Sequence, residues 1–123
     1  MAKKRVFISF DYDNDLNLKN LLAGQAKLPD SPFEISDWSL KEAAPEKDWE
    51  EKALTKIKRS DIVVVIAGTS TYKANGVKKE VNMARNNYIK VVQIKPQETN
   101  PTRVDNAGVL YDWTWENLKN LLS

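Results

Sequence analysis

The sequence predicts an α/β fold, in which a parallel sheet lies between two layers of helices. Two observations carry this prediction. Five short runs rich in β-branched and aromatic residues alternate with segments of helical periodicity, and three of these runs are almost wholly apolar. Apolar runs of this kind are typical of strands that helices cover on both faces. The chain has 123 residues and shows neither a repeat nor a linker-like segment, so we expect one domain over residues 1–123.

The five runs differ in polarity, and this difference predicts their order in the sheet. The central strands are expected at residues 6–10 (VFISF), 61–67 (DIVVVIA) and 89–94 (IKVVQI). Residues 33–38 (FEISDW) alternate between apolar and polar, which is typical of an edge strand, and a fifth, short strand is expected at 109–111. These roles fit the order 2-1-3-4-5, so we expect a flavodoxin-like three-layer sandwich with a five-stranded parallel sheet and helices on both faces.

Four amphipathic segments are expected to form the helices. They span residues 14–27, 45–59, 76–87, and 113 or 115 to 122. In the first, Leu18, Leu21, Leu22 and Ala26 recur at helical spacing. The second follows a polar loop at 39–47 and begins at a proline and two acidic residues, which favour a helix N-terminus.

The composition excludes several kinds of chemistry. The chain has no cysteine and no histidine, so disulfides, thiolate nucleophiles, histidine bases and zinc fingers are ruled out, and any catalysis must rest on carboxylates, hydroxyls, lysine or a bound ion. The net charge of +2 is too small to indicate binding to nucleic acid. No apolar run is long enough for a membrane span or a signal peptide, so we expect no membrane contact and a cytoplasmic location.

A ligand site is expected where strands 1 and 3 end, because ligands of doubly wound sheets bind beyond the carboxyl ends at the switch point. Residues 10–15 (FDYDND) and 68–76 (GTSTYKANG) meet there. The acids Asp11, Asp13 and Asp15 fit either a magnesium site, as in a receiver domain, or helix capping. The receiver interpretation is weak, because residue 67, at the end of strand 3, is alanine rather than aspartate.

Glu80 is the carboxylate of most interest. It lies about one turn into the third helix, and its position roughly 60° from Val77 on the helical wheel puts it on the shoulder of the buried stripe. That shoulder faces the expected crevice. The competing explanation is structural, since glutamate is favoured at any helix N-terminus.

The aromatic residues fall into two groups. Tyr12, Trp38 and Tyr72 are expected near the crevice, where they could stack on a planar ring, although packing explains any single aromatic residue as well. The second group has helical spacing and is expected in the core: Trp49, Trp113 and Trp115.

Together, these segments resemble a TIR domain. The resemblance rests on KRVFISF followed by DYDND (residues 4–15), on SDIVVVIAGTSTYKANGVKKEVNMA (60–84) and on IKVVQIKP (89–96). The chain is more narrowly similar to the short bacterial TIR-like group that includes the TIR subunit of the Thoeris antiphage system. The resemblance extends over roughly residues 4–94.

The resemblance implies a flavodoxin-like fold and, in catalytic members, cleavage of NAD as a substrate at its nicotinamide–ribose bond. That chemistry needs no metal, so the resemblance leads us to expect no metal and no cofactor. Glu80 falls where those enzymes carry their essential glutamate. The product would be ADP-ribose or a cyclic ADP-ribose isomer, which in Thoeris-like members activates a separate effector. The family also implies self-association through TIR-like surfaces.

The resemblance also implies substrate-binding residues at the loops around the pocket: Phe10, Asp11, Tyr12, Trp38, Ser39, Ser70, Tyr72 and Asn75. The sequence departs from the family in two places. Gly76 stands where many TIR enzymes have tryptophan, and the loop at 39–47 lacks a glycine. The sequence therefore leaves two functions open, an NAD-cleaving enzyme and a non-catalytic TIR-like interaction module.

Overall fold

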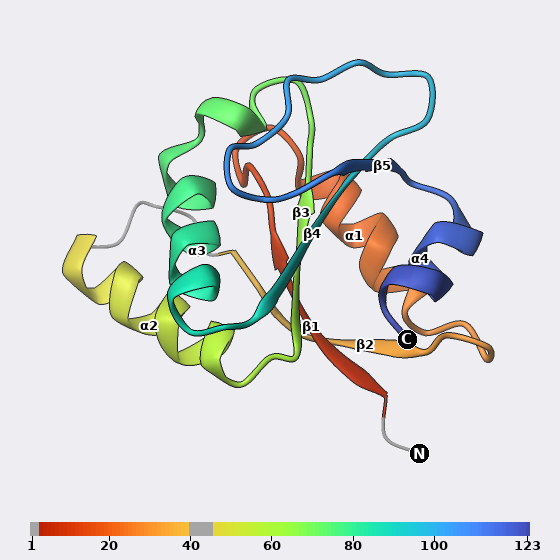
Figure 1. Cartoon of the computed structure of the whole chain (residues 1–123), viewed down its shortest axis with the longest axis horizontal. Helices are drawn as coiled ribbons and strands as arrows, with labels where there is room; N and C mark the ends of the chain where they lie inside the picture. Colours follow the sequence, from red (N-terminus) through yellow and green to blue (C-terminus); the bar gives the residue numbers. More distant parts are fainter. Residues whose placement is uncertain (1–2, 40–45) are drawn as a thin grey trace.

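The computed structural model describes residues 3–39 and 46–123 and contains a five-stranded parallel sheet (Figure 1). The strand order is β2-β1-β3-β4-β5, with every neighbouring pair parallel. This order confirms the predicted flavodoxin-like topology. The strands are β1 (Lys4–Ser9), β2 (Phe33–Trp38), β3 (Ile62–Ile66), β4 (Lys90–Lys95) and β5 (Leu110–Asp112).

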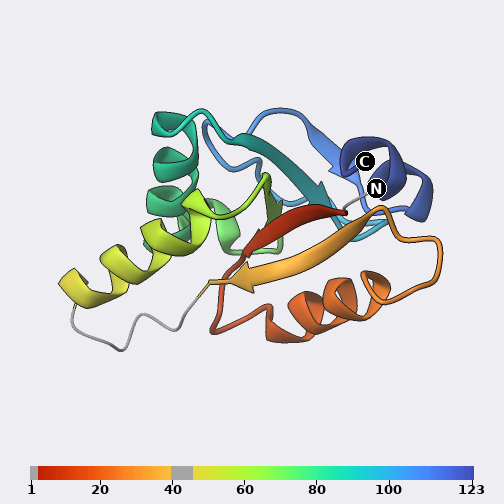
Figure 2. The same cartoon turned by 90° about the horizontal axis from the view of Figure 1, so that it is seen from below.

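Two pairs of helices cover the two faces of the sheet. The helices are α1 (Leu16–Gln25), α2 (Glu46–Lys58), α3 (Asn75–Asn86) and α4 (Trp115–Leu121), and a 3₁₀ turn, η1 (Thr71–Lys73), precedes α3. Helices α2 and α3 lie side by side on one face, and α1 and α4 lie on the other (Figures 1 and 2). The predicted helix start at Pro45 and most of the predicted loop at 39–47 lie outside the described residues.

Each face of the sheet has its own core because strand side chains alternate between the faces. On β3, Val63 and Val65 pack toward α2 and α3, whereas Ile62, Val64 and Ile66 pack toward α1 and α4. The five residues are almost completely buried. The same alternation places Phe7 of β1 on the α3 side, so Ser9, two residues later, also faces α3.

Helix α1 differs in detail from the prediction. It begins at Leu16 rather than at residue 14, and Leu21, one of the apolar residues at helical spacing, is 56% exposed. Lys19 is buried instead, with its Nζ 4.3 Å from the ring centroid of Trp38 on the edge strand. A lysine stem is apolar and its ammonium interacts favourably with an aromatic face, so Trp38 can cover the buried side chain of Lys19.

The long loop between β4 and β5 is fastened to the sheet by one buried side chain. Gln93 accepts a hydrogen bond from the Val104 amide (3.0 Å) and donates two, to the carbonyls of Val104 (3.3 Å) and Gly108 (2.6 Å). Gln93 is completely buried. This loop, like those after β1 and β3, follows the carboxyl end of a strand, so its position helps to shape that edge of the sheet.

Across residues 3–39 and 46–123, every helix is too short or too polar to serve as a transmembrane span.

Candidate active site

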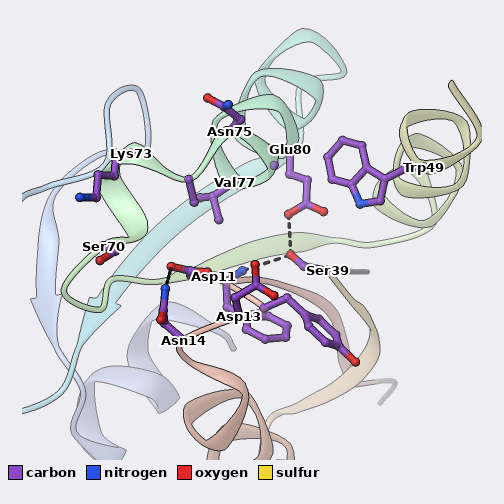
Figure 3. Close-up of a pocket in the computed structure, with 14 residues that line it drawn as sticks. Asp11, Asp13, Asn14, Ser39, Trp49, Ser70, Lys73, Asn75, Val77 and Glu80 are labelled. Atoms are coloured by element: carbon purple, nitrogen blue, oxygen red, sulfur yellow. Dashed lines mark hydrogen bonds between the residues drawn. The ribbon is translucent and has the colours of Figure 1, made fainter. Parts of the chain in front are cut away.

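A pocket of about 270 Å³ opens at the carboxyl edge of the sheet, between the loop after β1 and the start of α3 (Figure 3). This is the switch point at which the sequence predicted a ligand crevice. The pocket, called the Glu80 pocket below, is lined by Phe10, Asp11, Tyr12, Asp13, Asn14, Ser39, Trp49, Ser70, Lys73, Ala74, Asn75, Gly76, Val77 and Glu80.

Glu80 lies at the inner wall of this pocket and is completely buried. It is carried by α3, one turn after the helix start, on the face that also buries Val77 and Val81. Two serine hydroxyls donate to its Oε1, from Ser9 Oγ at 2.8 Å and from Ser39 Oγ at 2.5 Å. A carboxylate accepts such hydrogen bonds more strongly than a neutral group does, so the serines orient Glu80 and stabilise its charged form.

The two serines come from the ends of neighbouring strands, β1 and β2, and both bind the same oxygen atom of Glu80 on α3. Ser9 ends β1, and Ser39 directly follows β2. Ser39 Oγ also accepts a hydrogen bond from the backbone amide of Phe10 (3.1 Å). The Ser39 hydroxyl therefore connects Glu80 to the loop after β1, in addition to the hydrogen bond from Ser9.

An aromatic wall faces the carboxylate from a second helix. Trp49 of α2 is only 3% exposed and lines the pocket, and Figure 3 shows its indole beside Glu80. Lys79 Nζ lies 5.9 Å from the Trp49 ring centroid and forms an ion pair with Glu50 at 2.7 Å. These contacts join α2 to α3 and hold the indole at the edge of the pocket.

The turn after β1 forms the opposite wall. The rings of Phe10 and Tyr12 stack with their centroids 5.6 Å apart. Asp11 accepts a hydrogen bond from the side-chain amide of Asn14 at 2.7 Å, which closes the turn. The carboxylates of Asp11 and Asp13 line the same pocket as the ammonium of Lys73, so the site carries charges of both signs.

Asp15 does not cap α1 with its side chain, although capping was one of the two interpretations of the acidic turn. Its carboxylate turns to the loop after β3, where Thr71 Oγ1 donates to Oδ2 at 3.1 Å and itself accepts the Gly68 amide at 2.8 Å. Burial of this carboxyl group raises the pKa of Asp15, an effect that the Thr71 hydrogen bond partly offsets. Asp15 therefore braces the loop that carries Ser70 and Lys73.

Most of the predicted site residues meet in the Glu80 pocket. Those that line it are Phe10, Asp11, Tyr12, Ser39, Ser70, Asn75 and Glu80. Trp38 and Tyr72 do not line it: Trp38 lies under Lys19, and Tyr72 is 37% exposed on η1. The aromatic wall is Trp49, which the sequence placed in the core; it is buried and also lines the pocket.

The sequence analysis missed Ser9, Trp49 and Lys73. A signal existed for Ser9, because a polar residue inside an apolar strand run points to a polar partner on the covering helix. For Trp49 there was none, since its place at the pocket depends on how α2 docks against α3. Lys73 lies in the loop 68–76 that was predicted to border the crevice.

Within the described ranges 3–39 and 46–123, no group of three or more acidic side chains is arranged to hold a metal ion. The chemistry that this arrangement can perform rests on one buried, hydroxyl-bound carboxylate beside aromatic rings. Such a site can stabilise a positive charge that develops next to it.

A family model described as the TIR-like domain of the Thoeris protein ThsB matches residues 7–101. No curated protein matches the sequence. Among solved structures, the chain is similar to a 3-dehydroquinate dehydratase-like protein from Bifidobacterium longum, with 15% identity, a TM-score of 0.47, and coverage of 100% of this chain and 99% of the other.

Proposed function

Because the chain belongs to the TIR-like domain family of the Thoeris protein ThsB, we propose that it cleaves NAD at the nicotinamide–ribose bond in antiphage defence. Glu80 is the catalytic carboxylate in this proposal. The product is ADP-ribose or a cyclic ADP-ribose isomer, which acts as a signal for a separate effector in the cytoplasm.

The single observation that carries the proposal is the environment of Glu80. A completely buried carboxylate is costly unless hydrogen bonds compensate for its desolvation, and here two serines from two strands donate to one oxygen. A fold gains nothing in stability from such an arrangement that an apolar residue would not supply more cheaply. Its position in the wall of a pocket at the switch point supports a catalytic role.

The reaction needs only groups that this pocket contains. When the glycosidic C–N bond breaks, its electron pair goes to the pyridinium nitrogen and nicotinamide leaves as a neutral molecule. The ribose carbon becomes an oxocarbenium-like cation, which the carboxylate of Glu80 stabilises by its charge. Water or a nucleophile of the adenosine half then adds to that carbon and gives the linear or the cyclic product.

The aromatic side chains that line the Glu80 pocket suit nicotinamide, the leaving group of the reaction. Trp49 on one side and the stacked pair of Phe10 and Tyr12 on the other offer aromatic faces to a planar, positively charged nicotinamide ring. Trp49 thus supplies the aromatic contact that many TIR enzymes draw from the position of Gly76.

The alternative function is a non-catalytic module that binds another TIR surface. The volume of the Glu80 pocket, about 270 Å³, favours it, since pockets for small molecules usually measure about 300–1,000 Å³. The enzyme hypothesis accommodates the same fact if self-association or a second pocket completes the site.

The test is NAD turnover at high protein concentration, with the products separated by chromatography. Glu80→Gln keeps the shape and the hydrogen-bond acceptor but removes the charge, so we expect nicotinamide release to fall at least about 100-fold. The matched control is Glu116→Gln, an exposed acid of α4 on the other face of the sheet, which should retain wild-type activity.

Each result has a clear meaning. Release by wild type that Glu80→Gln abolishes supports the enzyme, and the second product shows whether the sugar is hydrolysed or cyclised. Release that survives in Glu80→Gln would refute the role of Glu80. If neither protein releases nicotinamide at any concentration, the interaction module is the better hypothesis.

A further inference from the structure

A second cavity lies beside the Glu80 pocket and has no role in the reaction described so far. It measures about 310 Å³ and is bounded by the starts of α1 and of the loops after β3 and β4. We call it the Asp15 pocket; the lining residues that matter here are Asp15, Leu18, Thr69, Pro96, Asn100 and Pro101.

The two pockets are neighbours along the carboxyl edge of the sheet. Asn14 lines the Glu80 pocket and Asp15 lines the second one. In the loop after β3, Ser70 lines the first and Thr69 the second. Two pairs of consecutive residues therefore form the ridge between the cavities.

The Asp15 pocket combines a buried carboxylate with apolar walls. Asp15 is 8% exposed, and its Oδ2 accepts the hydroxyl of Thr71. Leu18, Pro96 and Pro101 provide apolar surface. A carboxylate in such surroundings suits the hydroxyl pair of a ribose, as in dinucleotide-binding folds, and the apolar walls suit a purine ring.

The ridge carries groups that suit a diphosphate. The hydroxyls of Thr69 and Ser70 are hydrogen-bond donors, and Lys73 follows in η1. Lys73 is exposed and has no ion pair within residues 3–39 and 46–123, so its ammonium is available to an anion. In Figure 3, Ser70 and Lys73 lie on one side of Glu80 and Trp49 lies on the other.

We propose that the Asp15 pocket binds the adenosine half of NAD, with the diphosphate crossing the ridge of Thr69 and Ser70 beside Lys73. This inference rests on the proposed function and explains how a nicotinamide pocket of about 270 Å³ serves a much larger substrate. The nicotinamide riboside half lies against Glu80 and the adenosine half against Asp15.

The test compares NAD with nicotinamide mononucleotide, which lacks the adenosine half. Leu18→Phe narrows the Asp15 pocket, and Leu21→Phe adds the same ring on the same helix at an exposed position outside it. For Leu18→Phe we expect the KM for NAD to rise at least about tenfold and the rate with nicotinamide mononucleotide to stay unchanged. For Leu21→Phe, both should stay unchanged.

A binding measurement separates failure of this inference from failure of the proposed function. Adenosine monophosphate, titrated calorimetrically into the wild-type chain, should bind, and Leu18→Phe should weaken its binding at least about tenfold. This readout needs no turnover, so it decides about the pocket even if neither substrate is cleaved. Asn100→Phe, which narrows the pocket from an exposed loop, gives the same information if Leu18→Phe does not fold.

Three outcomes would overturn the inference. They are no binding of adenosine monophosphate to wild type, equal binding to Leu18→Phe and Leu21→Phe, and an equal loss of activity of Leu18→Phe toward both substrates.

Discussion

Replacing the two serines that hold Glu80 should destabilise the fold by unequal amounts. Ser9 and Ser39 each donate a hydroxyl to Glu80 Oε1, but the oxygen of Ser39 also accepts the backbone amide of Phe10. Ser9→Ala removes one hydrogen bond to a charged group. Ser39→Ala removes such a bond and also leaves a buried N–H without this acceptor.

These contacts set the expected magnitudes. A hydrogen bond to a charged group contributes about 1.5–3 kcal/mol, and a buried donor left unsatisfied costs about 1–3 kcal/mol. The free energy of unfolding should therefore fall by about 1.5–3 kcal/mol for Ser9→Ala and by about 2.5–6 kcal/mol for Ser39→Ala. The second value is a large share of the total stability of a domain, which is about 5–15 kcal/mol.

Urea denaturation followed by circular dichroism measures both losses, and a double-mutant cycle assigns them to Glu80. With Glu80→Gln, the acceptor is neutral, and hydrogen bonds between neutral groups contribute about 0.5–1.5 kcal/mol. Ser9→Ala should therefore cost about 1 kcal/mol less in that background. The control is Ser36→Ala, whose hydroxyl contacts the Val6 carbonyl and Ser60 and should cost the same in both backgrounds.

Two results would refute this reasoning. One is a larger loss for Ser9→Ala than for Ser39→Ala, which would contradict the double role of Ser39. The other is an equal cost of Ser9→Ala with glutamate and with glutamine at position 80, which would show that the charge of Glu80 does not matter to the serines.

Two further predictions concern stability. Because burial raises the pKa of Asp15, the folded chain binds this proton more tightly than the unfolded chain does. The wild type should therefore lose stability as the pH rises from about 3.8 through that raised pKa, and Asp15→Asn should not show this loss. Urea denaturation at a series of pH values measures both free energies of unfolding, and the same pH dependence in the two proteins would contradict the prediction. Gln93→Leu should lower the free energy of unfolding by about 2–4 kcal/mol, because the buried Val104 amide loses its acceptor and the carbonyls of Val104 and Gly108 each lose a donor. Trypsin should then cleave faster after Arg103 in the loop between β4 and β5; an unchanged cleavage rate would show that Gln93 does not hold this loop to the sheet.

The sheet was predictable because its signals are local. A continuous β-branched run such as residues 62–66 is typical of a buried central strand. The alternation of apolar and polar residues at 33–38 indicates a strand at the edge of the sheet. Glu80 was predictable for a related reason: its helical phase relative to Val77 follows from the spacing, and the structure places both on the buried face of α3.

The failures involve residues whose position depends on distant contacts. On α1, Lys19 is buried and Leu21 is exposed, and Lys19 contacts Trp38, a residue 19 positions later on another element. Trp38 lies against Lys19 of α1 and does not line the Glu80 pocket. Trp49 joins the pocket through the docking of α2 on α3, and a periodicity pattern contains no information about that docking.

The contact between Gly68 and Asp15 constrains how this sequence can change over evolution. A Cβ atom on Gly68 would lie 2.6 Å from Asp15 Oδ1 and 2.7 Å from its Cγ, closer than atoms can approach. A side chain at position 68 is therefore acceptable only after position 15 has become smaller or has moved, and that change would withdraw the partner of Thr71. Positions 15, 68 and 71 should therefore covary: related sequences that diverge from this chain should keep all three residues or replace them together.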